Sequence, residues 1–281
     1  MKLAVSSASM PSLTPTGLVA QLGGAGYSGV EWRMAAIDTL SAERPWEFRS
    51  NNRCTVAPTL AAVREIRAAC ADAGITIVSL SPYLTVGDLD GGRRLLELAA
   101  EAGSHRLRLW APRSDAGSYF TSCDRMVAFL EALVPHAAAH DVQLALEVHQ
   151  DTICASASLA MRIAGRFDPR VVTLIYDIGN LAVEGYEFPA MALELMGPHL
   201  GHVQIKNAAP RPAAAGQGWT WDWCPMESGV LPLERIVRLL AASGFDDWIS
   251  VEDFSTQHSD ADKLVRNRAW LAAWLQTPGS S

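Results

Sequence analysis

Three acidic residues in the second half of the sequence each end a short apolar run. Glu147 stands in LALEVHQ, Asp177 in LIYDIGN and Glu252 in ISVEDF. A carboxylate at the end of a buried strand is costly to desolvate, unless a metal ion or a catalytic role compensates for that cost. Independent surface acids are the alternative interpretation. Because the design recurs from strand to strand, we interpret the three acids as walls of one active site.

Strand alternation predicts which other side chains share the face of these acids. In DVQLALEVHQD, Glu147 and His149 alternate with an aliphatic row that suits the underside of a covering helix. In HVQIKN, the same period of two groups Gln204 with His202 and Lys206. We therefore expect one mouth to gather Glu147, Asp177, Glu252 and either Gln204 or His202.

This set of donors predicts a site for a divalent cation. Three carboxylates close together repel strongly unless a cation lies among them. Oxygen-rich ligation suits Mn²⁺ or Mg²⁺ better than a structural zinc ion. The cysteines form no CxxC pair, which argues against a thiolate zinc site. We expect Mn²⁺ or Mg²⁺ rather than Zn²⁺.

The acids belong to a regular alternation of strand-like and helix-like segments. Thr14 followed by Pro15 is typical of a helix start, and Gly103 of a helix end. The predicted strands are 3–7, 29–33, 75–83, 106–112, 141–151, 171–180, 202–207 and 248–254. The predicted helices are 14–25, 59–73, 88–102, 122–140, 156–166, 187–197, 233–243 and 260–276. Pro135 is a candidate kink in the fourth helix, and 208–230 is predicted to be a long loop.

Eight strand–helix units in this order predict a parallel sheet joined by right-handed crossovers. Eight such units close into a (β/α)8 TIM barrel, an α/β fold whose chemistry lies at the carboxyl ends of the strands. A doubly wound open sheet is the rival architecture, but no GxGxxG motif follows the first strand. We expect a single TIM-barrel domain over residues 1–281.

Composition narrows the function classes further. The 281 residues are 49% hydrophobic and carry a formal net charge of -7. An acidic protein lacks the electrostatic footprint for nucleic acid or anionic membranes, so neither is an expected partner. The cysteines are odd in number and widely spaced, which favours a reducing compartment, and no window reaches transmembrane length. We therefore expect a cytoplasmic protein.

Four segments resemble the xylose isomerase-like TIM-barrel family. They are LALEVHQ, LIYDIGN, GHVQIKN and GVLPLERIVRLLAASGFDDWISVEDF. The family includes ketose 3-epimerases, hydroxypyruvate isomerase, inosose dehydratase and the endonuclease IV fold. In its epimerases, Glu, Asp, His and Glu from strands five to eight hold the metal. The resemblance implies that the metal ligands here are Glu147, Asp177, Gln204 and Glu252.

Three positions depart from the pattern of the family epimerases. Gln204 replaces a ligand His, as it does in hydroxypyruvate isomerase, so the resemblance implies an amide oxygen ligand. We place His202 one layer below, either supporting the ligands or packed as an ordinary interior histidine. Asn180 replaces a His, and Arg211 lies near an Arg position without aligning with it. Both of these groups grip substrate hydroxyls in the epimerases, so the substrate and the reaction stay open.

The constellation and the resemblance together predict a metal-dependent isomerase or epimerase acting on a ketose or a related polyol-derived carbohydrate. Glu147 and Glu252 would approach opposite faces of a carbon next to a carbonyl, one removing a proton and the other returning it. Lys206 would neutralise oxyanion charge in the enediolate, unless it is a rim lysine with a solvated ammonium. His149 is a candidate substrate contact or a plain loop histidine, and Trp110 is a candidate wall.

Other functions stay open. A dehydratase or lyase of the inosose type would keep the metal and the bases but expel a β-hydroxyl, and a sugar-binding barrel would bind without reacting. The missing histidines disfavour a DNA-repair enzyme with several zinc ions. A homodimer is an expectation by resemblance only. Four loop residues are candidates for a lid over the substrate or for a solvated turn, namely Arg49, Asn51, Asn52 and Arg53.

Overall fold

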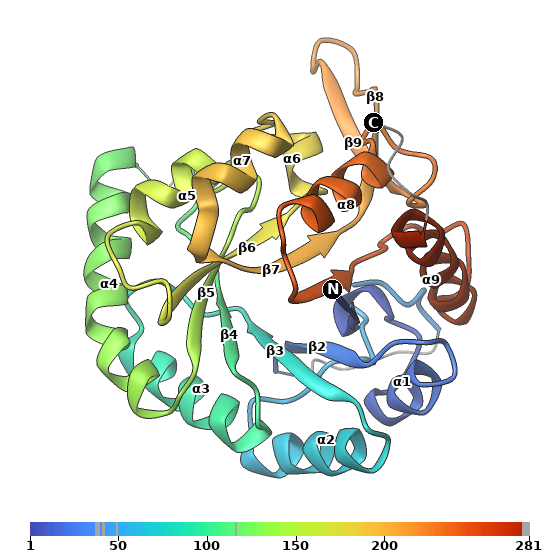
Figure 1. Cartoon of the computed structure of the whole chain (residues 1–281), viewed down its shortest axis with the longest axis horizontal. Coiled ribbons are helices and arrows are strands. Elements are labelled where there is room, and N and C mark those ends of the chain that lie inside the picture. Colours follow the sequence, from blue (N-terminus) through green and yellow to red (C-terminus); the bar gives the residue numbers. More distant parts are fainter. Residues whose placement is uncertain (37–39, 41–42, 49, 116, 277–281) are drawn as a thin grey trace.

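The computed structural model describes residues 1–36, 40, 43–48, 50–115 and 117–276. Within them, eight parallel strands close into a barrel in the order β1-β10-β7-β6-β5-β4-β3-β2 (Figure 1). The predicted (β/α)8 TIM barrel is therefore confirmed. The barrel strands are β1 (Lys2–Ser6), β2 (Gly29–Met34), β3 (Thr76–Pro82), β4 (Arg106–Leu109), β5 (Gln143–Glu147), β6 (Val172–Asp177), β7 (Leu200–Ile205) and β10 (Trp248–Val251).

Helices surround the barrel (Figure 1). The predicted capping is present, since Thr14 Oγ1 accepts the backbone amide of Gly17 at 3.1 Å, and Gly103 ends its helix with a φ of 71°. The helices are α1 (Pro15–Leu22), α2 (Leu60–Asp72), α3 (Leu89–Ala102), α4 (Tyr119–Ala139), α5 (Ala157–Ala164), α6 (Asn180–Val183), α7 (Pro189–Met196), α8 (Leu233–Ala242) and α9 (Asp260–Gln276), with 3₁₀ turns at Ser7–Ser9 and Gly197–His199. None of the helices in the described part of the chain is long and apolar enough to cross a membrane.

Alternation along the strands sorts side chains between the core and the barrel interior. In β5, Leu144 and Leu146 are fully buried in the hydrophobic core, so Glu147 points to the other face. The strand register places polar residues of neighbouring strands side by side, since Asp177 in β6 pairs with Gln204 in β7. The backbone thus brings the carboxyl ends of β5, β6, β7 and β10 to one mouth.

Two predictions about irregular segments are wrong. The expected long loop contains an antiparallel hairpin of β8 (Asn207–Pro212) and β9 (Trp219–Cys224), which projects beyond the barrel (Figure 1). Helix α4 runs through Pro135 to Ala139, one residue short of the predicted end at 140. Among the candidate lid residues, Arg49 lies outside the described residues. Asn52 is no solvated turn residue, because it is 4% exposed and its Nδ2 donates to the Ala8 carbonyl at 2.9 Å.

Candidate active site

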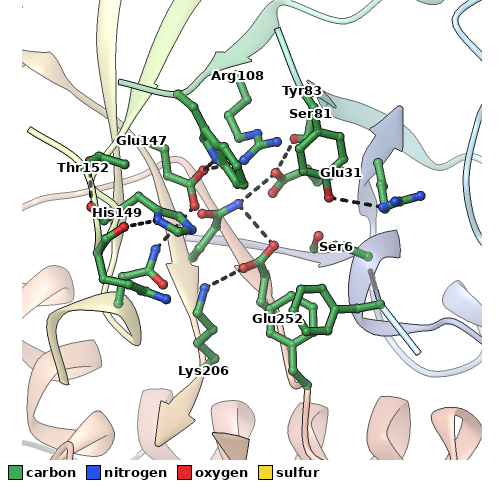
Figure 2. Close-up of a pocket in the computed structure, with 18 of the residues that line it drawn as sticks. Ser6, Glu31, Ser81, Tyr83, Arg108, Glu147, His149, Thr152, Lys206 and Glu252 are labelled. Carbon is green, nitrogen blue, oxygen red and sulfur yellow. Dashed lines mark hydrogen bonds and ion pairs between the residues drawn. The ribbon is translucent and has the colours of Figure 1, made fainter. Parts of the chain in front are cut away.

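A cavity of about 530 Å³ opens at the carboxyl ends of the barrel strands (Figure 2). Its floor and walls contain charged and amide side chains from β2, β4, β5 and β7 and from the segments after β7 and β10. We call the following buried residues the acid cluster: Glu31, Arg108, Glu147, Asp177, Gln204, Lys206 and Glu252. The structure therefore brings the four predicted metal ligands together with three further charged residues.

Glu147 forms one side of the acid cluster. Arg108 Nη1 donates to Glu147 Oε2 at 2.6 Å, and Trp110 Nε1 donates to the same oxygen. Burial raises the pKa of Glu147, but the charge of Arg108 and that of Lys206 outweigh it, so the pKa is lowered. Glu147 is consequently an ionised carboxylate at neutral pH, the state that a general base requires.

Lys206 lies between two other acids of the cluster. Its Nζ is 2.8 Å from Glu252 Oε2 and also donates to Asp177 Oδ2. Burial lowers the pKa of Lys206, but Asp177 and Glu252 outweigh it and the pKa is raised. The lysine is only 2% exposed, so the alternative of a rim lysine with a solvated ammonium is wrong.

The stem of Lys206 occupies a close-fitting channel. A Cβ at Gly179 would lie 2.0 Å from Lys206 Cγ, so a side chain at that position would displace the lysine. The ammonium lies 5.2 Å from the ring centre of Trp223 and 5.4 Å from that of Phe254, within the range of cation–π contact. Lys206 is thus held by two carboxylates, two aromatic rings and a glycine.

Asp177 is fully buried and contacts Lys206 and Asn180, which line the cavity. Asn180 Nδ2 donates to Asp177 Oδ2 at 2.6 Å, and the backbone amide of Gly179 donates to Oδ1 at 3.0 Å. Burial and the negative charges of Glu252 and Glu147 raise the pKa of Asp177 to about 8, against the opposing charge of Lys206. Asn180 therefore occupies the expected place beside the acids, where it contacts a predicted ligand.

Glu31 and His202 form a layer next to Gln204. Gln204 Nε2 donates to Glu31 Oε1 at 2.8 Å, and His202 Nε2 lies 3.2 Å from Glu31 Oε2. Burial raises the pKa of Glu31, but hydrogen bonds from His202 and Ser81 and the charge of Arg108 lower it to about 2. His202 is fully buried and lies outside the cavity lining, one layer below Gln204 as expected.

The remaining predicted residues divide between the cavity and the outside. His149 lines the cavity with its ring centre 4.8 Å from that of Trp110. Burial lowers the pKa of His149, so this imidazole is neutral at neutral pH. Arg211 does not reach the cavity. It is exposed on β8, and its Nε is 2.7 Å from the Asp222 carboxylate on β9, so the hairpin turns it outward.

Sequence reasoning missed Glu31 and gave Arg108 no role in the site. The segment GVEWR was read as a strand, and its alternation could have placed Glu31 on the inner face opposite Val30 and Trp32. Arg108 shares its strand face with Trp110, the candidate wall, so the same count could have placed it near the site. Alternation along one strand shows which side chains face the barrel interior. It does not show which side chains of other strands they contact there.

The donor chemistry of the acid cluster fits a divalent cation. Its four carboxylates outnumber its two cations, so negative charge is in excess when all the acids are ionised. Gln204 Oε1 is buried and has no hydrogen-bond partner in the described part of the chain, as expected of an oxygen that awaits a cation. Among the described residues, no three acidic, histidine or cysteine side chains converge as a ready metal cluster. In this structure Lys206 pairs with Asp177 and Glu252, and Arg108 pairs with Glu147.

Comparison with known proteins places this fold in a family. The family model for the xylose isomerase-like TIM barrel matches residues 19–274. A search of curated proteins found no significant match. Solved structures similar to this chain include the probable 3-DHS dehydratase AsbF from Bacillus anthracis, with 17% identity, a TM-score of 0.73 and coverage of 97% of this chain and 99% of that one.

Two other solved structures show the same likeness. The 3-keto-D-glucoside 4-epimerase YcjR from E. coli has 18% identity and a TM-score of 0.70, over 97% of this chain and 99% of that one. A xylose isomerase-like TIM barrel protein from Mycobacterium smegmatis, in complex with magnesium, has 18% identity and a TM-score of 0.66, over 98% and 96%. At these identities the likeness concerns the fold. With the family match over most of its length, this chain belongs to the xylose isomerase-like TIM-barrel family.

Proposed function

We propose that this protein is a divalent-metal-dependent isomerase or epimerase that moves a proton next to the carbonyl of a ketose-type carbohydrate. One observation carries the proposal. An ionised carboxylate, Glu147, and a second carboxylate, Glu252, line one cavity (Figure 2). Gln204 lines it too, and its amide oxygen has no partner in the described part of the chain. Proton transfer at carbon needs positioned bases and a means of stabilising the oxyanion that forms.

Four side chains would hold the cation, namely Glu147, Asp177, Gln204 and Glu252. When bound, a divalent ion supplies Lewis-acid polarisation of a carbonyl and its neighbouring hydroxyl. Oxygen donors of this kind favour Mn²⁺ or Mg²⁺ over Zn²⁺. The magnesium complex of the similar Mycobacterium smegmatis barrel supports this preference.

The two glutamates would divide the proton transfer. Glu147 is ionised and held by Arg108 and Trp110, so its carboxylate is oriented before substrate arrives. Glu252 directly follows β10, which β6 and β7 separate from β5 in the barrel. One glutamate would take the proton from carbon and the other would return it on the opposite face. Lys206, which is 2.8 Å from Glu252, would donate to the oxygen that gains charge.

The cavity walls favour a carbohydrate. Aromatic rings suit the CH faces of a sugar, while the polar base suits its hydroxyls. Trp110 stands edge-on to Tyr83 with ring centres 5.2 Å apart on one side, and Trp223 lies 6.0 Å from Phe254 on another. All four rings line the cavity. A volume of about 530 Å³ is large for a triose, and we propose a monosaccharide or a larger polyol derivative.

A dehydratase is the second candidate, and one observation favours it. Asn180 replaces the His of the family epimerases, and Arg211 pairs with Asp222 outside the cavity, so the expected grips on substrate hydroxyls are missing. A β-elimination needs only the proton abstraction and the departure of a hydroxyl. The similar 3-DHS dehydratase is consistent with this alternative.

Solvent exchange separates these functions. The Mn²⁺-loaded protein is incubated in D₂O with a panel of ketoses, inososes and 3-DHS, and carbon-bound protons are followed by NMR beside a chelated control. We expect metal-dependent loss of one substrate proton signal. A sugar epimer or isomer as product supports the proposed reaction, whereas an unsaturated product supports the dehydratase. Sugar binding without any exchange would contradict both.

A further inference from the structure

We propose that Glu31 is a positioning residue that holds the nitrogen of the Gln204 amide and so leaves the amide oxygen free to bind the metal. The inference rests on the proposed function, because it concerns a member of the proposed ligand set. It assigns a role to a residue on the opposite side of the barrel, in β2. Glu31 itself is not proposed as a ligand.

The two ends of a glutamine amide have nearly the same size, so shape alone does not orient them. Chemistry does, because an ionised carboxylate only accepts hydrogen bonds and the amide nitrogen only donates them. Gln204 Nε2 is 2.8 Å from Glu31 Oε1 and 3.4 Å from Glu252 Oε1. The nitrogen is therefore engaged, and Gln204 Oε1 is left buried without a donor in the described part of the chain.

Glu31 is itself fixed from two other strands. Ser81 Oγ from β3 donates to Glu31 Oε1 at 2.5 Å, and His202 Nε2 from β7 lies 3.2 Å from Oε2. The carboxylate is fully buried, so rotation away from these partners would leave a buried charge unpaired. Figure 2 shows Glu31 and Ser81 directed into the same cavity. A fixed acceptor at this point gives Gln204 one orientation.

This orientation decides what kind of ligand β7 supplies. With the nitrogen held by Glu31 and the oxygen free, the proposed ligand set has only oxygen donors, which Mn²⁺ and Mg²⁺ prefer. With the amide reversed, an NH₂ group would face the cation and repel it. Partners that orient a ligand commonly change metal affinity by about 10–100-fold when they are removed. In this proposal a residue of β2, Glu31, influences which metal ion the site prefers.

A double-mutant cycle tests this role. Mn²⁺ affinity is measured by electron paramagnetic resonance of the free ion for the wild type, Glu31→Gln, Gln204→Ala and the double variant. Glu31→Gln offers an NH₂ group that lets Gln204 reverse, so we expect a loss of about 10–100-fold in the presence of Gln204. In the Gln204→Ala background, the same change should cost little, because no amide remains to orient. Equal losses in both backgrounds would overturn the proposal, since Glu31 would then act through its charge.

Two more variants guard against a general disturbance of the barrel. Glu31→Asp keeps the charge but withdraws the acceptor from Gln204, so its Mn²⁺ affinity should also fall, and an unchanged affinity would overturn the proposal. Thr173→Val removes a buried hydroxyl that has no hydrogen-bond partner in the described residues, and it should leave Mn²⁺ affinity unchanged. Unfolding curves of each metal-free variant show that it is folded when titrated.

Failure of this inference is distinguishable from failure of the proposed function. A wild-type protein that binds Mn²⁺ and exchanges substrate protons, but whose affinity ignores Glu31→Gln, would overturn only the positioning role. A wild-type protein that binds no Mn²⁺ would overturn both. A wild-type protein that binds Mn²⁺ without exchanging protons would overturn the proposed reaction, while the cycle would still decide the role of Glu31.

Discussion

Glu252 and Asp253 are neighbours in the chain, yet they belong to two buried polar clusters of opposite character. Glu252 belongs to the acid cluster. Asp253 belongs to what we call the anchor cluster, formed by Asp253, Asp260, Lys263 and Asn267, which ties α9 to the end of β10 and to the segment after β1. Both clusters are buried and charged. Burial of charge therefore does not by itself tell an active site from a structural bond.

The two clusters differ in whether their buried polar atoms have hydrogen-bond partners. In the anchor cluster, Lys263 Nζ donates to the Ser9 carbonyl at 2.8 Å and lies 2.8 Å from Asp260 Oδ1, and Asn267 Nδ2 donates to Asp253 Oδ2 at 2.9 Å. The charged and amide atoms there have partners. In and beside the acid cluster, by contrast, Gln204 Oε1 and Asn180 Oδ1 are buried without partners in the described part of the chain. Unsatisfied buried atoms call for a ligand, and Gln204 and Asn180 both line the cavity.

Removing the proposed base should have the largest effect. In Glu147→Gln, the amide cannot take a proton, so we expect metal-dependent exchange of substrate protons to fall by about 10²–10⁴-fold. NMR in D₂O at saturating Mn²⁺ measures it. As a matched control in the anchor cluster, Asp260→Asn should leave the exchange rate of the folded protein unchanged. Full exchange by Glu147→Gln would show that Glu147 is not the base.

Replacing the lysine of each cluster, Lys206 or Lys263, should affect the free energy of unfolding differently once Mn²⁺ is added. Lys263→Met leaves Asp260 buried without its cation, so we expect the free energy of unfolding to fall by about 3–5 kcal/mol. Lys206→Met should also destabilise the metal-free protein, because Asp177 and Glu252 would then face each other. Urea unfolding with and without Mn²⁺ measures the difference. We expect Mn²⁺ to restore stability in Lys206→Met but not in Lys263→Met, and equal behaviour would erase the distinction between the clusters.

Metal binding should stabilise the fold by mass action. At a free Mn²⁺ concentration of about 100 times Kd, the expected gain in the free energy of unfolding is about 2.7 kcal/mol. Thermal unfolding before and after chelation measures it. The gain should vanish in Asp177→Asn and persist in Asp260→Asn, whose change lies in the anchor cluster. A gain that survives Asp177→Asn would place the ion elsewhere.

Stability of the metal-free protein should depend on pH through Asp177. Its pKa is raised from 3.8 to about 8 in the folded state, so between these values the folded state binds more protons than the unfolded state. The free energy of unfolding therefore falls as pH rises from about 4 to about 8. Urea unfolding in chelator at several pH values should show this decline, and Asp177→Asn should flatten it. A decline of the same slope in the variant would assign it to other groups.

Local patterns predicted most of the fold. The signals are local. They are period-two alternation, capping residues such as Thr14 and helix-ending glycines such as Gly103, and their recurrence in successive strand–helix units strengthens the prediction. The hairpin escaped because Pro210 and Pro212 in its first strand are typical of loops. Both prolines are tolerated because each strand of this two-stranded sheet is an edge strand. On its outer side there is no neighbouring strand, so the missing N–H of a proline costs no hydrogen bond there.

The site was only partly predictable, for a reason of geometry. Parity places Glu147, Asp177, Gln204 and Glu252 on inner faces, which needs only local alternation. It does not say that Arg108 pairs with Glu147, or that Glu31 reaches Gln204 from the opposite part of the barrel, because closure of the sheet sets those contacts. Parity puts Lys206 on the inner face but does not predict its burial, which depends on the space that Gly179 leaves.

Counting the Mn²⁺ ions that the wild-type protein binds tests the central claim most directly. Electron paramagnetic resonance of free Mn²⁺, titrated into the chelator-treated protein, gives both stoichiometry and affinity. The account predicts one ion per chain, lost in Asp177→Asn and kept in Asp260→Asn, because of the two clusters only the acid cluster combines excess negative charge with a ligand oxygen that has no partner in the described part of the chain. The account would be contradicted if the wild type bound no Mn²⁺, or if Asp177→Asn bound the ion as tightly as the wild type does.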